Sequence, residues 1–393
     1  MNKVYIVSGC RTPIGVMGGA FKTMMAAQLG SIAVKEAVKR AGIAPEQVDE
    51  VFMGCGVQAG QKPNVARQCS IGAGLPVTVP ATTVNVLCGS GLHSINLAAK
   101  QIAGGYADVI VAGGTESMST APYLVLNGRF GYRLGPGKLE DSLQYDALND
   151  AFYGYHMGVT AENVADQWNL TRQQMDELAA ESQRRAVEAR DSGRFDAEIV
   201  PVEVKTRKGT VIVDKDEGPR PGTTVEVLSK LKAVFRKENG RVTAGNASGI
   251  NDGASAIVLM SEAKVKELGI TPMAEWLGGD LGGVDPSIMG TGPIVSTNKL
   301  LKKLGLTVND MDLIEANEAF AAQTLAVAHD LGFDMSKVNV NGGAIALGHP
   351  LGDSGCRILV TLLYEMQRRD AKKGLATLCI GGGMGCSAVV ERP

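Results

Sequence analysis

Three side chains beside glycine-rich turns could together perform nucleophilic and acid–base chemistry: Cys88, His349 and Cys379. Cys88 lies within Asn85–Gly91, where a short apolar run ends and a helical pattern begins. A thiol at the start of a helix lies near the positive end of the helix dipole, which favours the nucleophilic thiolate. The sequence therefore predicts a nucleophile at Cys88, with a buried structural cysteine as the alternative.

His349 is one of four histidines and ends a glycine-rich run that starts at Asn341. An imidazole exposed by such a turn can take up a proton near neutral pH. Cys379 lies near the end of an apolar run, directly before Ile380 and three glycines. Open α/β sheets bind ligands beyond the carboxyl ends of their strands. We therefore predict a base at His349 and a ligand-facing thiol at Cys379, with plain packing as the alternative for both.

Alternating strand and helix patterns are expected to position these turns. Apolar residues between 28 and 41 follow helical spacing, and Gly42 provides a stop. A further helix is predicted at 173–190. Short apolar runs predict strands at 4–8, 48–53, 108–112, 199–204 and 376–380. Strands that alternate with helices indicate an α/β fold.

The chain repeats one order of elements. Val84–Val86 leads into the Cys88 turn, as Val338–Val340 leads into the His349 turn. In both copies a helical pattern and then a strand pattern ending in glycines follow. Two copies of one α/β unit explain this order, and they would make the two turns face each other. The intervening segment, about 121–247, is more charged, and we predict an insertion lying over the site.

Composition excludes several other classes. The 393 residues exceed what one compact core usually covers, and the net charge of −2 gives no general attraction to nucleic acid or membranes. No apolar stretch reaches the ~18 residues of a membrane span. Seven cysteines without a C-x-x-C pair favour free thiols in a reducing compartment over a zinc site, so we predict a cytoplasmic protein that binds no metal.

Four ordered motifs resemble the signature blocks of the thiolase superfamily, and the resemblance covers essentially the whole chain. They are Cys88-Gly89-Ser90-Gly91, Asn317-Glu318-Ala319-Phe320, Gly348-His349-Pro350 and Cys379-Ile380-Gly381-Gly382-Gly383. The resemblance is greatest to bacterial biosynthetic acetyl-CoA acetyltransferases. It implies reversible Claisen condensation of two acetyl-CoA to acetoacetyl-CoA and CoA through an acetyl-cysteine.

The resemblance also implies the role of each residue. Cys88 would be the nucleophile, His349 the acceptor of its proton and Cys379 the base that removes an α-proton from the second acetyl-CoA. His349 and a water held by Asn317 would bind the thioester oxygen of that substrate. The backbone amides of Cys88 and Gly381 would bind the acyl-enzyme oxygen. Glu318 would orient its neighbours, with helix capping as the alternative.

Substrate contacts follow from the same resemblance. The residues matching positions that line the CoA site are His156, Met157, Arg220, Ser248, Met289 and Phe320. Arg220 would contact a phosphate, and Met157 and Met289 would narrow the acyl pocket. Coenzyme A is then a substrate and product, and no cofactor is expected. Asp353 and Cys356 depart from the family pattern, because small residues are more usual after the His-Pro turn.

The implied fold is the thiolase fold, two α/β/α/β/α layered units with an inserted loop domain. We expect an N-terminal half of residues 1–120 plus 248–271, an inserted CoA-binding domain of residues 121–247, and a C-terminal half of residues 272–393. The stretch 125–136 stands where thiolases build a tetramer contact, so a homotetramer formed as a dimer of dimers is expected.

Three alternatives remain open. A longer-chain 3-ketoacyl-CoA thiolase of fatty-acid degradation shares every catalytic residue. A catalytically silent CoA- or lipid-binding protein of the same fold would be expected to lack one of the four catalytic residues, and all four are present. A ketoacyl synthase would usually carry histidine in place of Cys379.

Overall fold

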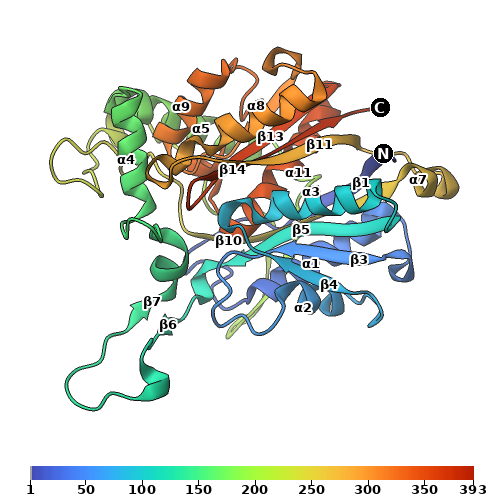
Figure 1. Cartoon of the computed structure of the whole chain (residues 1–393), viewed down its shortest axis with the longest axis horizontal. Coiled ribbons are helices and arrows are strands. Elements are labelled where there is room, and N and C mark those ends of the chain that lie inside the picture. The colour runs from blue at the N-terminus through green and yellow to red at the C-terminus, as the bar shows by residue number, and fades with distance from the viewer. Residues whose placement is uncertain (1) are drawn as a thin grey trace.

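One large sheet runs through the whole molecule. The computed structural model describes residues 2–393. Its strands lie in the order β12-β13-β14-β11-β1-β10-β5-β3-β4, with β2 pairing with β10 (Figure 1). Their bounds are β1 Val4–Arg11, β2 Gly15–Val16, β3 Glu50–Gly54, β4 Ala81–Val84, β5 Val109–Ser117, β10 Asn251–Ser261, β11 Ala274–Gly283, β12 Leu313–Ala316, β13 Lys373–Ile380 and β14 Met384–Glu391.

The sheet consists of two half-sheets with mirrored strand order. Strands β1 and β11 join them through only two residue pairs, Tyr5 with Glu275 and Ile6 with Ala274. Outward from this seam, one half reads β1-β10-β5-β3-β4 and the other β11-β14-β13-β12. The place of β4 is taken in the second half by a parallel bridge between Val338 and Ile314. The predicted repeat is therefore present as a pseudo-twofold pair of units.

Helices cover and separate the half-sheets. Helix α1 (Ala26–Ala41) packs on β1, β5 and β10, and α8 (Gly292–Leu304) packs on β11, β13 and β14. Helices α3 (Ser90–Ala103) and α11 (Leu351–Arg369) contact each other and strands of both halves, so they form the central layer. The predicted helix at 28–41 is confirmed, and Gly42 ends it in the left-handed conformation at φ 69°. The layered α/β prediction is confirmed as well.

Strand β5 is longer than predicted. The expected end at residue 112 is wrong, because the strand continues through Gly113 and Gly114 to Ser117. These glycines allow close packing instead of a turn. A Cβ on Gly113 would lie 2.1 Å from the carbonyl oxygen of Ser255, and one on Gly114 would lie 2.1 Å from that of Gly352. The extension carries Glu116 into the centre of the molecule.

The predicted insertion is mainly helical where it meets the body. It contains α4 (Met157–Gln167), α5 (Arg172–Asp191), α6 (Val225–Leu228) and the hairpin of β8 (Val202–Thr206) and β9 (Gly209–Val213). Helix α5 confirms the prediction at 173–190, whereas the predicted strand at 199–204 begins only at Val202. The short strands β6 (Tyr123–Leu124) and β7 (Glu140–Asp141) flank a loop that extends away from the body (Figure 1). The three predicted domain boundaries stay predictions.

A buried carboxyl group lies where the two halves meet. Asp353 in the first turn of α11 is 1% exposed and accepts a short hydrogen bond from the Ser255 hydroxyl of β10. Burial raises the pKa of Asp353 to about 7, although Ser255, Arg357 and Arg11 counteract the rise. The unusual residue after the His-Pro turn is thus a buried ionisable group and not a surface substitution.

Asp353→Asn should change how stability depends on pH. The folded-state pKa of Asp353 exceeds its unfolded value of 3.8. Between about pH 4 and 7, the Asp353 carboxyl is therefore protonated in the folded protein but not in the unfolded protein. Wild-type stability falls as pH rises through that window. The asparagine cannot ionise and still accepts the Ser255 hydrogen bond. The variant should therefore gain stability relative to wild type as pH rises from about 4 to 7, by at most about 1.4 kcal/mol per pH unit, and the difference should then level off.

Thermal midpoints of both proteins across this pH range measure the effect. Buried Glu315, whose pKa burial raises to about 8, also titrates, but it is present in both proteins and cancels in the difference. The exposed Asp214→Asn variant provides a control whose midpoint should track wild type. Parallel curves for wild type and Asp353→Asn would contradict the expectation.

Candidate active site

The turn that carries Cys88 is fixed by its own side chains. Asn85 Oδ1 accepts the amide of Leu87 at 3.0 Å, and the Ser90 hydroxyl donates to the Leu87 carbonyl at 2.6 Å. Leu87 adopts φ +48°, a strained value for a residue with a side chain. A Cβ on Gly89 would lie 2.3 Å from Ile380 Cδ1, so any larger residue there would displace the Ile380 side chain. These contacts hold Cys88 directly before α3, as predicted.

The helix end alone does not ionise the nucleophile predicted at Cys88 in the free protein. Burial raises the pKa of the Cys88 thiol to about 12, even though the backbone amides of Gly381 and Cys88 itself favour the ionised form. The loss of hydration outweighs the amides and the helix end. Cys88 is therefore a neutral thiol near pH 7, and a base must remove its proton before it can act as a nucleophile.

His349 is placed to be that base. Its Nδ1 lies 2.6 Å from the Ser354 hydroxyl oxygen, and that hydroxyl donates its single proton to the Pro350 carbonyl at 2.9 Å. Ser354 must then accept from Nδ1–H, which leaves a lone pair on Nε2. Burial, together with the charge of Arg357, lowers the pKa of His349 to about 3. The imidazole is neutral, and its free nitrogen can accept a proton.

Two buried polar atoms in this region are unsatisfied. Within residues 2–393, neither His349 Nε2 nor Asn317 Oδ1 has a hydrogen-bond partner. Asn317 follows β12, is 1% exposed, and its Nδ2 lies 3.4 Å from His349 Nδ1. Buried polar atoms are rarely left unpaired unless a ligand or water completes them. Each of these two atoms therefore remains available to a ligand or a water molecule.

Cys379 is the penultimate residue of β13 and is fully buried. Burial raises the pKa of its thiol, and the neighbouring Cys88 adds to the rise. Gly381 lies two residues further, where a Cβ would come within 2.9 Å of both Leu87 Cδ1 and Met157 Cε. The absence of a side chain at Gly381 thus lets the two cysteine-bearing turns and Met157 converge. All seven cysteines are free in the described part of the chain.

One cavity of about 230 Å³ brings most of the predicted residues together. The predicted residues among its lining are Cys88, His156, Met157, Ser248, Met289, Phe320, His349, Cys379 and Gly381. Asn317 contacts His349 but does not line this cavity. Arg220 is exposed and lines an adjoining cavity of about 320 Å³, which shares Ala244, Ala247 and Gly249 with the first. The predicted site is therefore one continuous region with Arg220 at its outer end.

His156 builds one wall of the cavity. Its Nδ1 accepts the Gly158 amide at 2.9 Å and so caps α4, while burial lowers its pKa. Its ring stacks on Phe235 with 4.6 Å between centroids. Phe235 was missed by the sequence prediction, because it lies in the charged insertion and belongs to no motif. Other apolar lining residues that carry no motif were missed as well: Met118, Ala147, Leu148, Val234, Ile250 and Leu351.

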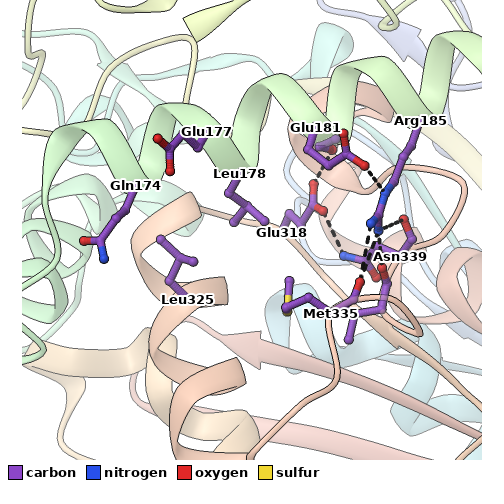
Figure 2. Close-up of a pocket in the computed structure, with 11 residues that line it drawn as sticks. Gln174, Glu177, Leu178, Glu181, Arg185, Glu318, Leu325, Met335 and Asn339 are labelled. Carbon is purple, nitrogen blue, oxygen red and sulfur yellow. Dashed lines mark hydrogen bonds and ion pairs between the residues drawn. The ribbon is translucent and has the colours of Figure 1, made fainter.

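A third cavity, of about 260 Å³, lies between α5 and Glu318 and is lined by neither cysteine nor histidine. Figure 2 shows Glu318 on its floor, beneath α5. The Glu318 carboxylate accepts the Ser182 hydroxyl at 2.6 Å and Asn339 Nδ2 at 2.9 Å. These bonds agree with the predicted orienting role of Glu318, because they anchor the segment that carries Asn317. Residues 2–393 contain no cluster of three or more side chains suited to a metal ion.

The sequence matches known families over almost its whole length. Residues 4–263 match the family described as "Thiolase, N-terminal domain", and residues 270–392 match "Thiolase, C-terminal domain". The acetyl-CoA acetyltransferase of Syntrophomonas wolfei is 57% identical over 394 residues, covering 99% of each chain. The acetyl-CoA acetyltransferase of Cupriavidus necator is 54% identical, and the comparison covers 100% of both chains.

Two solved structures are similar throughout. The crystal structure of the Bacillus anthracis acetyl-CoA acetyltransferase has a TM-score of 0.98 and 46% identity. Human mitochondrial 3-ketoacyl-CoA thiolase has a TM-score of 0.97 and 47% identity. Each comparison covers 100% of this chain and 99% of the other. No helix within residues 2–393 has the length and apolar character of a membrane span.

Proposed function

This chain belongs to the thiolase family, and from that premise we propose that it is an acetyl-CoA C-acetyltransferase. The reaction is the reversible condensation of two acetyl-CoA to acetoacetyl-CoA and CoA. One observation carries the proposal: a single cavity is lined by two thiols, Cys88 and Cys379, and by a neutral imidazole, His349. The curated relatives at 53–57% identity bear the same activity in their names.

The first half-reaction transfers an acetyl group to Cys88. His349 Nε2 takes the thiol proton, and the Cys88 sulfur attacks the thioester carbonyl carbon. The backbone amides of Cys88 and Gly381 stabilise the charge on the acyl oxygen. When the bond to CoA sulfur breaks, the leaving thiolate takes a proton from Cys379. The products are acetyl-Cys88, free CoA, an imidazolium at His349 and a thiolate at Cys379.

The second half-reaction forms the carbon–carbon bond. The Cys379 thiolate removes an α-proton from a second acetyl-CoA, and the resulting carbanion attacks the acetyl carbon on Cys88. Cys88 leaves as a thiolate and recovers its proton from His349. His349 and a water held by Asn317 are proposed to stabilise the enolate oxygen. The unsatisfied atoms of His349 and Asn317 support this position. Cys88, His349 and Cys379 all return to their starting protonation states.

The remaining cavity residues are proposed to bind the substrate. His156, Ser248 and Phe320 would contact the pantetheine arm, and Arg220 in the adjoining cavity would contact a phosphate. Met157 and Met289 are buried in the cluster that includes Cys379, which places two flexible side chains at the acyl end. They are proposed to favour a short acyl chain. No cofactor beyond the CoA substrates is proposed, nor any nucleic-acid or membrane partner.

Chain-length kinetics test this function. Acetoacetyl-CoA should be cleaved with higher kcat/KM than a six-carbon 3-ketoacyl-CoA, because the two methionines leave little room. Each methylene that fails to fit changes discrimination by ~10–200-fold. Met289→Ala should raise relative efficiency toward the longer substrate. Equal or rising efficiency with length in the wild-type protein would favour the longer-chain alternative, which the similarity to human 3-ketoacyl-CoA thiolase keeps open.

The assembly and compartment are proposals too. A cytoplasmic homotetramer, built as a dimer of dimers, is supported by two observations. The loop between β6 and β7 exposes large apolar side chains, including Phe130 at 89% and Leu134 at 98% exposure. Exposed apolar groups of this kind are typical of interaction sites. All cysteines of the described residues are free, as expected in a reducing compartment.

A further inference from the structure

Glu116 gathers backbone amides from both halves of the molecule. It lies near the end of β5 and is fully buried. Its Oε2 accepts the amide of Gly56 at 2.8 Å and that of Gly352 at 2.7 Å, and its Oε1 accepts the amide of Val57 at 3.1 Å. Gly56 and Gly352 lie in the N-terminal and C-terminal halves. A single carboxylate therefore links them.

One arm of this link leads to the nucleophile. The Gly56 carbonyl accepts Asn85 Nδ2 at 3.0 Å, and Asn85 Oδ1 accepts the Leu87 amide at 3.0 Å. Leu87 directly precedes Cys88 and is held at a positive φ of 48°. A strained residue keeps its conformation only where its surroundings determine it. The hydrogen bonds that run from Glu116 through Gly56 and Asn85 help to hold Leu87 in this conformation.

The other arm leads to the base. Gly352 lies in the first turn of α11, two residues before Ser354, whose hydroxyl holds His349 Nδ1. The turn packs directly against the first arm. A Cβ on Gly352 would lie 2.7 Å from both Cys55 Cα and the Gly56 nitrogen. Glu116 binds both segments, and it therefore helps to fix the distance between the Cys88 turn and the His349 turn.

We propose that Glu116 is a positioning residue, which fixes the nucleophile of one half relative to the base of the other. It does not line the catalytic cavity and is not part of the chemistry. The inference rests on the proposed function, since it concerns the same Cys88 and His349. Glu116 then affects the rate of the reaction, in addition to holding the two halves together.

The donor set requires a carboxylate at this position. Both oxygens only accept: Oε2 from two amides, and Oε1 from the Val57 amide and the Cys55 thiol at 3.4 Å. Glutamine has the same size, but its NH₂ group would face N–H or S–H donors in either orientation. Glu116→Gln thus breaks one arm of the link without creating a cavity.

The first experiment compares kcat with KM. Glu116→Gln should lower kcat by about 100-fold, the typical effect of a ~1 Å misplacement, while KM changes less than about threefold. Acetylation of Cys88 should slow in parallel. Asp49→Asn is the matched control, because Asp49 Oδ2 accepts the amides of Asp108 and Val109 at 2.8 Å each, at the opposite end of β5. Its kcat should equal that of wild type.

A second variant decides the question if Glu116→Gln does not fold. Asn85 is exposed, so Asn85→Ala should fold and break only the arm to Leu87. Its kcat should fall about tenfold or more, with KM again unchanged. If Glu116→Gln folds, the double variant should be no slower than Glu116→Gln alone within about threefold, since both changes act through one link.

Wild-type kcat in Asn85→Ala, or in a folded Glu116→Gln variant, would overturn the inference. A rise in KM at constant kcat would overturn it as well. The proposed function fails separately, if the wild-type protein neither acetylates Cys88 nor forms acetoacetyl-CoA. An active wild type with unimpaired variants rejects the positioning role alone.

Discussion

Cys88→Ala is expected to abolish condensation, thiolysis and acyl-enzyme formation together. Alanine removes the only atom proposed to carry the acetyl group, so no later step can compensate. Loss of a nucleophile that works as one unit with its base lowers the rate by up to ~10⁶-fold, and we expect a decrease of at least about 10⁴-fold. The residue is half-buried, so truncation should leave the fold intact.

Peptide mass spectrometry after incubation with acetyl-CoA measures the intermediate directly. One acetyl group should appear on Cys88 of the wild-type protein and none on the variant. Cys10→Ala is the matched control. Burial raises the pKa of Cys10 to about 12, as for Cys88, but its thiol donates to the Ala33 carbonyl and does not line the cavity. Acetylation confined to a cysteine other than Cys88 would contradict the assignment.

Local patterns predicted the elements and the turns well. The helix stop predicted at Gly42 is confirmed. The repeated order of elements corresponds to two half-sheets with mirrored strand order. The four motifs placed Cys88, His349 and Cys379 around one cavity. The helix stop and the turns depend on residue types within a few positions of one another, which is the information that a single sequence carries most directly. The repeat came from comparing distant segments, and the roles of Cys88, His349 and Cys379 came from the resemblance to the thiolase superfamily.

Features that depend on distant segments could not be predicted. Strand β5 passes through Gly113 and Gly114 because β10 and α11 approach closely, and a sequence pattern reads such glycines as a turn. The thiol pKa of Cys88 depends on burial by segments far along the chain, which local helix-end reasoning omits. Phe235 enters the cavity wall from an irregular segment with no periodic pattern.

Cys379→Ser is expected to separate the two half-reactions. A serine hydroxyl is a much weaker acid than a thiol, so it does not supply the base that removes the α-proton. Removing a positioned base lowers the rate by ~10²–10⁴-fold, and condensation should fall by that factor. Acetyl transfer to Cys88 requires no carbon acid, and the imidazolium at His349 can protonate the leaving CoA in place of Cys379. Partial acetylation of Cys88 should therefore survive.

Packing alone could also lower activity, because Cys379 is fully buried. Cys386→Ser controls for this effect. Cys386 is equally buried, pairs with Leu378 across the β13–β14 hairpin, and has a thiol pKa that burial raises to about 12. A purely structural role for Cys379 would make both serine variants lose acetylation and condensation to a similar degree. A chemical role leaves Cys386→Ser active in both assays, whereas Cys379→Ser forms acetyl-Cys88 that persists because no carbanion arrives to consume it. Condensation by Cys379→Ser at the wild-type rate would assign the second proton transfer to another group of the cavity, such as His349, whose Nε2 has no hydrogen-bond partner.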